Sequence, residues 1–99
     1  MKDLAITQLY DVYAPLLSEK QRTVFEYYYD EDLSLSEIAE HTHTTRQGVR
    51  DLLKRSEEQL RGFEDRLHLS EKTEKLRTIC ANISDIKLKT EIENILSNS

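Results

Sequence analysis

Apolar residues recur every three or four positions along most of this chain, which is the spacing of one face of an α-helix. Two Gly and one Pro in 99 residues leave few turns, and no alternating run of β-branched residues indicates a strand. In the first helix we expect Leu4 in the apolar stripe and Ile6 at its margin. The pattern predicts an all-α fold with helices over residues 3–14, 18–29, 36–42, 45–67, 70–83 and 85–96.

Short polar residues mark where these helices should begin. Such a side chain, placed just before an apolar stripe, can accept a hydrogen bond from the free backbone N–H groups of the first turn. Ser18 is followed three positions later by Gln21, which is the pattern of a reciprocal capping box, and Pro15 ends the preceding helix. The expected N-caps are Asp3, Ser18, Ser36, Thr45 and Ser70.

The helix expected over residues 45–67 carries an apolar stripe with the repeat of a coiled-coil seam. One explanation is that the two C-terminal helices of the same chain bury it. The other is contact with a second copy, because a small chain with a long apolar stripe gains from association. We favour the second explanation and expect a homodimer. The stripe consists of Val49, Leu53, Ser56, Leu60, Phe63 and Leu67.

Residues 34–55 have the layout of two short helices joined at a tight corner. Helices that cross steeply touch at few positions, and the first needs a small residue at the crossing point. Ala39 meets this need beside Ile38, and Val49 and Leu52 follow at the spacing of a helix-turn-helix. We therefore divide the chain into 1–67, a helix-turn-helix domain with a long recognition helix, and 68–99, a C-terminal helical extension for packing or dimerisation.

Charge is distributed unevenly, and this matters more than the net charge of −5. Residues 1–45 hold three Lys or Arg against nine Asp or Glu, a net of −6. Residues 46–55 hold four bases, Arg46, Arg50, Lys54 and Arg55, against Asp51 alone, a net of +3. Bases and acids balance from residue 67 onward, with five of each. The concentrated positive charge thus lies at the start of the expected recognition helix.

Five residues at that helix start are candidate nucleic-acid contacts: Thr45, Arg46, Gln47, Arg50 and Lys54. Arg and Gln side chains can make paired hydrogen bonds to guanine and adenine edges. Thr45 can cap the helix and touch a phosphate at its N-terminus. The three bases are spaced four apart and share a face, which we place roughly opposite the Val49–Leu53 stripe. The alternative is a solvated helix face on which arginine pairs with Asp51.

The corner between the two helices is unusually polar. Thr42 and Thr44 bury less surface than Leu or Val, so we expect loose packing there. His43 has to adopt a left-handed backbone conformation, which is uncommon for this residue. His41 and His43 lack a third ligand at suitable spacing, so no metal site is expected.

The remaining composition argues against several classes of function. No Gly-rich phosphate loop, Cys–His pair or carboxylate cluster in apolar surroundings is found, so we expect neither an enzyme nor a cofactor. Cys80 is the single cysteine and lies between apolar neighbours, which predicts a buried thiol and no internal disulfide. No stretch approaches the roughly 18 apolar residues that span a bilayer. We expect a cytoplasmic protein that does not bind a membrane.

The sequence from Leu17 to Leu60 resembles the promoter-reading fourth region of bacterial sigma factors. The stretches SLSEIAE, TRQGV and FEDRLHL are also similar, in order and spacing, to the YlxM-type family of small helix-turn-helix proteins. This second resemblance covers about residues 4–69. The sigma-like positions are Leu17, Gln21, Arg22, Val24, Phe25, Tyr28, Leu33, Ser34, Glu37, Ile38 and Ala39.

The resemblance implies a link to protein targeting, because YlxM-type proteins are usually encoded beside the GTPases of the signal recognition particle pathway. It places the nucleic-acid face on the same five residues, Thr45 to Lys54. We expect a helix-turn-helix DNA-binding regulator. The alternative is a protein-interaction module that binds the targeting GTPase or the particle's RNA and does not read DNA. We interpret Tyr27–Tyr29 as core and rim residues rather than as an RNA-stacking platform.

Overall fold

The computed structural model describes residues 2–97 and confirms the all-α prediction, with no strand in that range. Six α-helices and one 3-10 turn follow one another with short connections. They are α1 (Leu4–Tyr13), η1 (Ala14–Leu16), α2 (Glu19–Tyr29), α3 (Leu35–Thr42), α4 (Arg46–Leu67), α5 (Leu69–Ala81) and α6 (Ile86–Ser97). None of the helices described is both long enough and apolar enough to span a bilayer.

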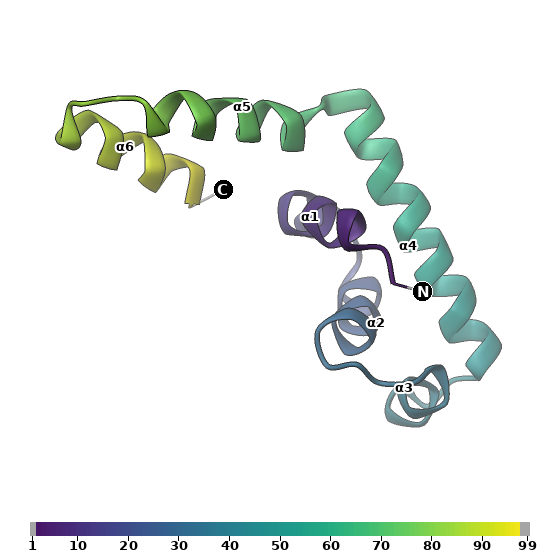
Figure 1. Cartoon of the computed structure of the whole chain (residues 1–99). Helices are drawn as coiled ribbons and strands as arrows, with labels where there is room; N and C mark the ends of the chain where they lie inside the picture. The colour runs from purple at the N-terminus through teal and green to yellow at the C-terminus, as the bar shows by residue number, and fades with distance from the viewer. Residues whose placement is uncertain (1, 98–99) are drawn as a thin grey trace.

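The 22-residue helix α4 is the element on which the others assemble. Helices α1, α2 and α3 pack against one side of it (Figure 1). The pair α5–α6, which we call the arm, leaves the C-terminal end of α4 and projects away from α2 and α3 (Figure 1). The molecule is therefore elongated, with extents of 53 × 25 × 23 Å.

Two apolar clusters along α4 form the core. The first joins α1, α2 and the middle of α4, and the second joins α2, α3 and the beginning of α4. Helix α4 supplies residues to both clusters, and the two clusters together hold the helix-turn-helix unit in place. The first holds Ile6, Tyr13, Leu17, Phe25 and Leu60, and the second holds Val24, Ile38, Ala39, Val49 and Leu53.

The seam predicted on α4 exists, but both expectations about what covers it are wrong. Val49, Leu53, Ser56 and Leu60 are buried against α1, α2 and α3 of the same chain, and not under the C-terminal helices. That part of the seam is therefore closed to a second copy as well. Only its end is open, with Leu67 exposed. The three preceding helices supply the buried apolar partners of this seam in two clusters.

Two of the predicted helix starts are also wrong. Asp3, Ser18 with Gln21, and Thr45 cap their helices as predicted. Helix α3, however, is capped by Ser34 and not by Ser36, because the Glu37 carboxylate accepts a hydrogen bond from the Ser34 backbone N–H and completes a capping box. Ser70 does not cap α5, which begins directly at Leu69. The residue before it, His68, takes a left-handed conformation with φ of 53°.

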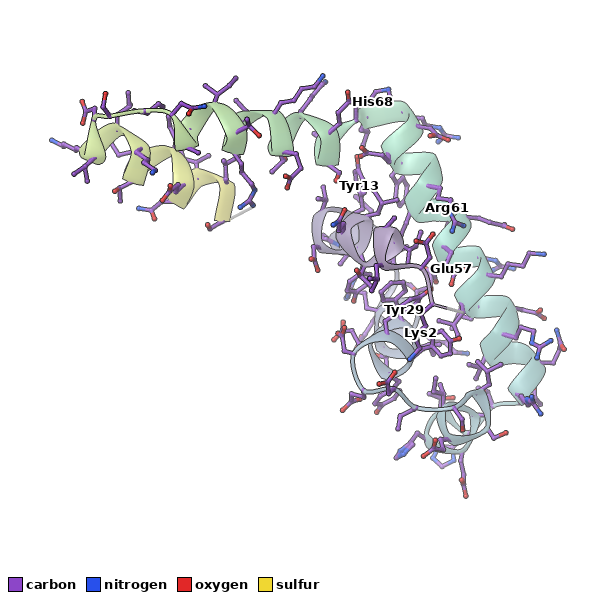
Figure 2. The ribbon with its side chains drawn as sticks, viewed as in Figure 1. Lys2, Tyr13, Tyr29, Glu57, Arg61 and His68 are labelled. Carbon is purple, nitrogen blue, oxygen red and sulfur yellow. The ribbon has the colours of Figure 1, made fainter. Side chains whose placement is uncertain are left out.

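A carboxylate from α4 caps α5 in place of Ser70. Glu64 accepts hydrogen bonds from the Tyr13 hydroxyl at 2.6 Å and from the backbone N–H groups of Ser70 and Glu71 at 3.0 and 3.2 Å. The Leu69 N–H donates to the same Tyr13 oxygen at 2.9 Å. A negative charge is favoured at a helix N-terminus. Tyr13 and Glu64 thus hold the arm to the rest of the chain, and Tyr13 lies below the end of α4 that carries His68 (Figure 2).

The tyrosine run takes the core-and-rim role that was predicted for it. Tyr27, Tyr28 and Tyr29 are all partly buried. The ring of Tyr29 stacks on Phe25 at 4.3 Å, and Phe25 stacks in turn on Tyr10 at 4.2 Å. The Tyr29 hydroxyl donates to Glu57 of α4 at 2.7 Å (Figure 2). Burial, and then this hydrogen bond, raise the pKa of Tyr29 well above its ordinary value.

No close contact in the structure requires a glycine at Gly62, which lies in the interior of α4. A Cβ at this position would meet no other atom within 4 Å. We expect Gly62→Ala to raise the free energy of unfolding by up to about 1 kcal/mol, because alanine restricts the unfolded chain and favours helix. Urea unfolding followed by circular dichroism measures this. Gly48→Ala is the comparison and should gain less, since its Cβ would lie 3.1 Å from the capping Thr45 oxygen.

Candidate nucleic-acid interface

The corner of the helix-turn-helix is braced where the sequence predicts it. Ala39 of α3 is buried beside Ile38 and packs in the same cluster as Val49 and Leu53 of α4. Leu52 packs against this cluster from its edge and is partly buried. The small side chain at Ala39 lets the two helix backbones approach, and so sets the direction of the start of α4.

The polar residues of the corner are satisfied by hydrogen bonds. The Thr42 hydroxyl donates to the Ile38 carbonyl at 2.8 Å and lies 2.9 Å from the Thr44 hydroxyl. His43 adopts the left-handed conformation predicted for it, with φ of 55° and ψ of 41°. Its backbone N–H and that of Thr44 close the end of α3 onto the Ala39 carbonyl. Hydrogen bonding thus replaces part of the apolar packing that this corner lacks.

The strain at His43 gives a measurable prediction. A non-glycine residue in the left-handed region costs about 1 kcal/mol, and the His43 side chain is exposed. We therefore expect His43→Gly to stabilise the fold by roughly 0.5–1 kcal/mol, less the entropy that glycine restores to the unfolded chain. Thermal unfolding measures the change. A loss of stability greater than about 1 kcal/mol, more than the entropy of glycine explains, would show that the imidazole has a contact role at the corner.

Thr45 caps the recognition helix by accepting a hydrogen bond from the Gly48 N–H at 3.0 Å. Arg46, Arg50 and Lys54 follow on α4, and all three side chains are exposed. Within the part of the chain that the structure describes, none of these three makes an ion pair or side-chain hydrogen bond. Three positive charges are therefore available at the surface beside a helix N-terminus.

The alternative interpretation, an ion pair between arginine and Asp51, is not found in the described residues. Asp51 instead accepts a hydrogen bond from the Gln47 amide at 2.9 Å. Gln47 is thus partly engaged within its own helix, and it would have to release Asp51 to make a paired contact with a base. Arg46 and Arg50 carry no such constraint.

Comparisons with known proteins identify the family of this chain. A family model described as "UPF0122: Putative helix-turn-helix protein, YlxM / p13 like" matches residues 1–98. The chain belongs to this family. A UPF0122 protein of Clostridium botulinum is 42% identical over 90 residues, which is 90% of this chain and 83% of the relative. One from Shouchella clausii is 44% identical over 82 residues, 83% of this chain and 75% of the relative.

A further relative has higher identity over a shorter match. The UPF0122 protein of Clostridium kluyveri is 52% identical over 68 residues, which is 69% of this chain and 61% of the relative. The YlxM-type resemblance seen in the sequence is therefore confirmed, and the fold of this UPF0122 chain is that of a helix-turn-helix protein.

The sequence suggested that the basic residues lie opposite the apolar seam of α4. In this UPF0122 chain they lie on the flank of the helix instead. Arg50 and Lys54 line a surface hollow together with Tyr28 of α2 and Leu35 of α3. The reason is angular: at 100° per residue, Arg50 is turned only about 100° from Val49. Glu57 borders the same hollow and reduces its positive charge.

Lys20 is a candidate contact that the sequence interpretation missed. It lies in the first turn of α2 and borders a second hollow with Thr44 and Gly48, beside the start of α4. Its side chain is exposed. Counting charge along the sequence hides it inside the acidic first 45 residues, since only the fold brings it next to the corner.

The histidines of the corner do not assemble a metal site. His41 contacts the ring of Tyr27, with ring centres 5.6 Å apart. No group of three or more His, Cys, Asp or Glu side chains in residues 2–97 is arranged to hold a metal ion. The chemistry offered by the corner is therefore that of exposed cations and a helix N-terminus.

Proposed function

We propose that this chain is a small DNA-binding regulatory protein that contacts the nucleic acid through Thr45, Arg46, Gln47, Arg50 and Lys54. The observation that carries the proposal is the exposure of Arg46 and Arg50, without ion pairs, at the start of a helix braced by Ala39. Guanidinium groups in this position can reach base edges in a major groove. The helix N-terminus beside them favours a phosphate.

The overall acidity of the chain limits the affinity but does not prevent binding. Contacts with phosphate act within about a Debye length, roughly 8–10 Å at physiological salt. The net charge of +3 over residues 46–55 therefore counts for more locally than the −5 of the whole chain. With so few bases, we expect weak binding that falls steeply with salt concentration.

We further infer that the protein acts in the cytoplasm in the signal recognition particle pathway, as a homodimer. Residues 1–67 serve as the nucleic-acid-binding domain, and residues 68–99 as the extension that pairs two copies. Dimeric helix-turn-helix proteins place their recognition helices about 34 Å apart, in successive major grooves. The resemblance to the YlxM-type family supports the link to protein targeting.

A second candidate function is that of an interaction module for the targeting GTPase or its RNA. The observation that favours it is the acidic surface: residues 1–45 have a net charge of −6, and Asp51 and Glu57 lie among the bases of α4. Such a surface suits a basic protein partner better than a polyanion.

Titrations at two salt concentrations separate these functions. Fluorescently labelled promoter DNA of the chain's own operon and signal-recognition-particle RNA are each titrated with the protein at about 50 and 200 mM salt. Salt-dependent binding of the DNA supports the regulator. If neither nucleic acid binds and the targeting GTPase co-elutes with the chain on a sizing column, the interaction module is the correct function.

A further inference from the structure

The arm exposes much more large apolar surface than the rest of the molecule. Helix α6 has no buried residue, and α5 has only Cys80 among the residues described. The arm therefore has almost no core of its own. Seven of the nine large apolar side chains that are exposed in residues 2–97 lie at its root or on it: Leu67, Leu69, Leu76, Ile79, Ile86, Leu88 and Ile95.

The two sides of the arm differ in chemistry. Arg77 and Ala81 of α5 border a hollow on one side, together with Lys89 and Glu93 of α6. Cys80 points between the helices, where its thiol contacts the Lys89 carbonyl at 3.6 Å. The side that carries this hollow thus holds three charged side chains, Arg77, Lys89 and Glu93, beside the apolar Ala81 and Leu96.

Four of the exposed apolar residues, Leu76, Ile79, Leu88 and Ile95, lie on the opposite side. At 100° per residue, Leu76 and Ile79 are turned from Cys80 in the direction away from Arg77. On α6, counted from Lys89, Leu88 and Ile95 are turned in the direction opposite to Glu93. Because α5 and α6 run antiparallel (Figure 1), both turns lead to the same side of the hairpin. We call these four residues the arm face.

Together with Leu69 and Ile92, the residues of the arm face have the spacing of a helical bundle. On α5, Leu69, Leu76 and Ile79 are separated by seven and three residues. On α6, Leu88, Ile92 and Ile95 are separated by four and three. Such repeats belong to helices that pack side by side at a small angle. A hairpin with one seam on each helix, left exposed in residues 2–97, matches half of a four-helix bundle.

We propose that a second copy of this chain covers the arm face, so that two arms form a four-helix bundle. Residues 67–99 hold five bases and five acids, so like charges do not oppose the pairing of two arms. A face that is apolar and lies in a segment without net charge offers little to a polyanion or to a strongly charged partner. A twin presents the same apolar seams and the same balance of charge.

This arrangement leaves the candidate nucleic-acid interface open. The arm joins α4 at the end opposite Arg46, and a helix of 22 residues is about 33 Å long. The inference rests on the proposed homodimer and names its surface. It does not depend on whether α4 binds nucleic acid.

Light scattering on a sizing column, at micromolar protein, tests the inference. The wild-type chain of 11.6 kDa should elute with about twice that mass. Ile79→Glu combined with Leu88→Glu should elute as a monomer, because each interface would bury four unpaired carboxylates. Ile86→Glu is the matched control: Ile86 is 79% exposed but lies outside the arm face, so this variant should remain a dimer. Circular dichroism checks that each variant keeps its helices.

Three results would overturn the inference. The first is a wild-type monomer throughout the concentration range. The second is dissociation by Ile86→Glu as complete as that by the double variant. The third is a double variant that stays dimeric, which would leave the homodimer standing but exclude the arm face. If the double variant loses helix, Leu88→Ala with Ile95→Ala replaces it, and its dimer dissociation constant should rise at least about tenfold.

Discussion

Replacing Arg46 and Arg50 together by alanine is expected to abolish specific nucleic-acid binding while the fold stays intact. A bidentate contact from arginine to a base contributes about 1–3 kcal/mol. Loss of both therefore weakens binding by at least about 30-fold. Neither side chain makes a hydrogen bond or ion pair in residues 2–97. The free energy of unfolding should thus change by less than about 0.5 kcal/mol.

Fluorescence anisotropy with labelled DNA measures this loss. The slope of log K against log salt should become shallower by about two if both groups also neutralise phosphates. Lys72→Ala with Arg77→Ala removes the same charge from α5, far from the start of α4, and should leave the affinity nearly unchanged. Equal weakening in this control would show that binding responds to net charge and not to the proposed interface.

The substitution Glu64→Gln is expected to have the largest effect on stability outside the apolar core. The Glu64 carboxylate accepts hydrogen bonds from Tyr13, Ser70 and Glu71 and so joins the arm to α1 and α4. Hydrogen bonds to a charged group contribute about 1.5–3 kcal/mol, and glutamine keeps only part of this set. We expect the free energy of unfolding to fall by about 1–3 kcal/mol. Amide exchange at the start of α5 should accelerate more than exchange in α2.

The effect of Glu64 should depend on pH with a definite sign. Burial acts to raise the pKa of Glu64, but the hydrogen bonds from Tyr13, Ser70 and Glu71 outweigh it and the pKa is lowered from its ordinary 4.5. A carboxyl whose pKa is lower in the folded state stabilises the fold above its unfolded pKa. That stabilisation is lost as the pH falls through the folded pKa. The difference in stability between wild type and Glu64→Gln should therefore be full at pH 7 and shrink below about pH 4.5.

Urea unfolding at pH 7 and at pH 3 measures both parts of this prediction. Glu58→Gln is the matched control, because Glu58 lies exposed on the same helix and makes no hydrogen bond or ion pair in the described chain. It should change the free energy of unfolding by less than about 0.5 kcal/mol. A Glu64 variant as stable as this control would contradict the assigned role of the carboxylate.

Short stretches of sequence determine the local features of this fold. Ser18 with Gln21 predicts a capping box and Thr45 predicts a helix start, since a cap depends on residues three positions apart. The same rule, applied to Ser34 and Glu37, would have corrected the start of α3, so that error was one of interpretation. The brace of Ala39 against Val49 was likewise predictable, because its spacing is set within one supersecondary unit.

Other features could not be predicted, because they depend on which helices pack against each other. Leu4 is 78% exposed and Ile6 is 1% exposed, the reverse of expectation, because α1 turns Ile6 and Tyr13 together toward α4. Lys20 joins the corner only through the packing of α2. Periodicity identifies an apolar face but carries no information about its orientation or its partner.

By itself, the sequence determined the all-α class, the helix-turn-helix with its basic start at Arg46 and Arg50, and the family. The helix-turn-helix lies within residues 34–55, and the class and the family follow from short stretches that keep their order along the chain. Tertiary structure alone decided that α1, α2 and α3 cover the seam of α4, and that Glu64 and Tyr13 cap α5. Those contacts join residues up to 56 positions apart, and burial of apolar surface, which is non-directional, selects among many such pairings only when the whole chain is packed.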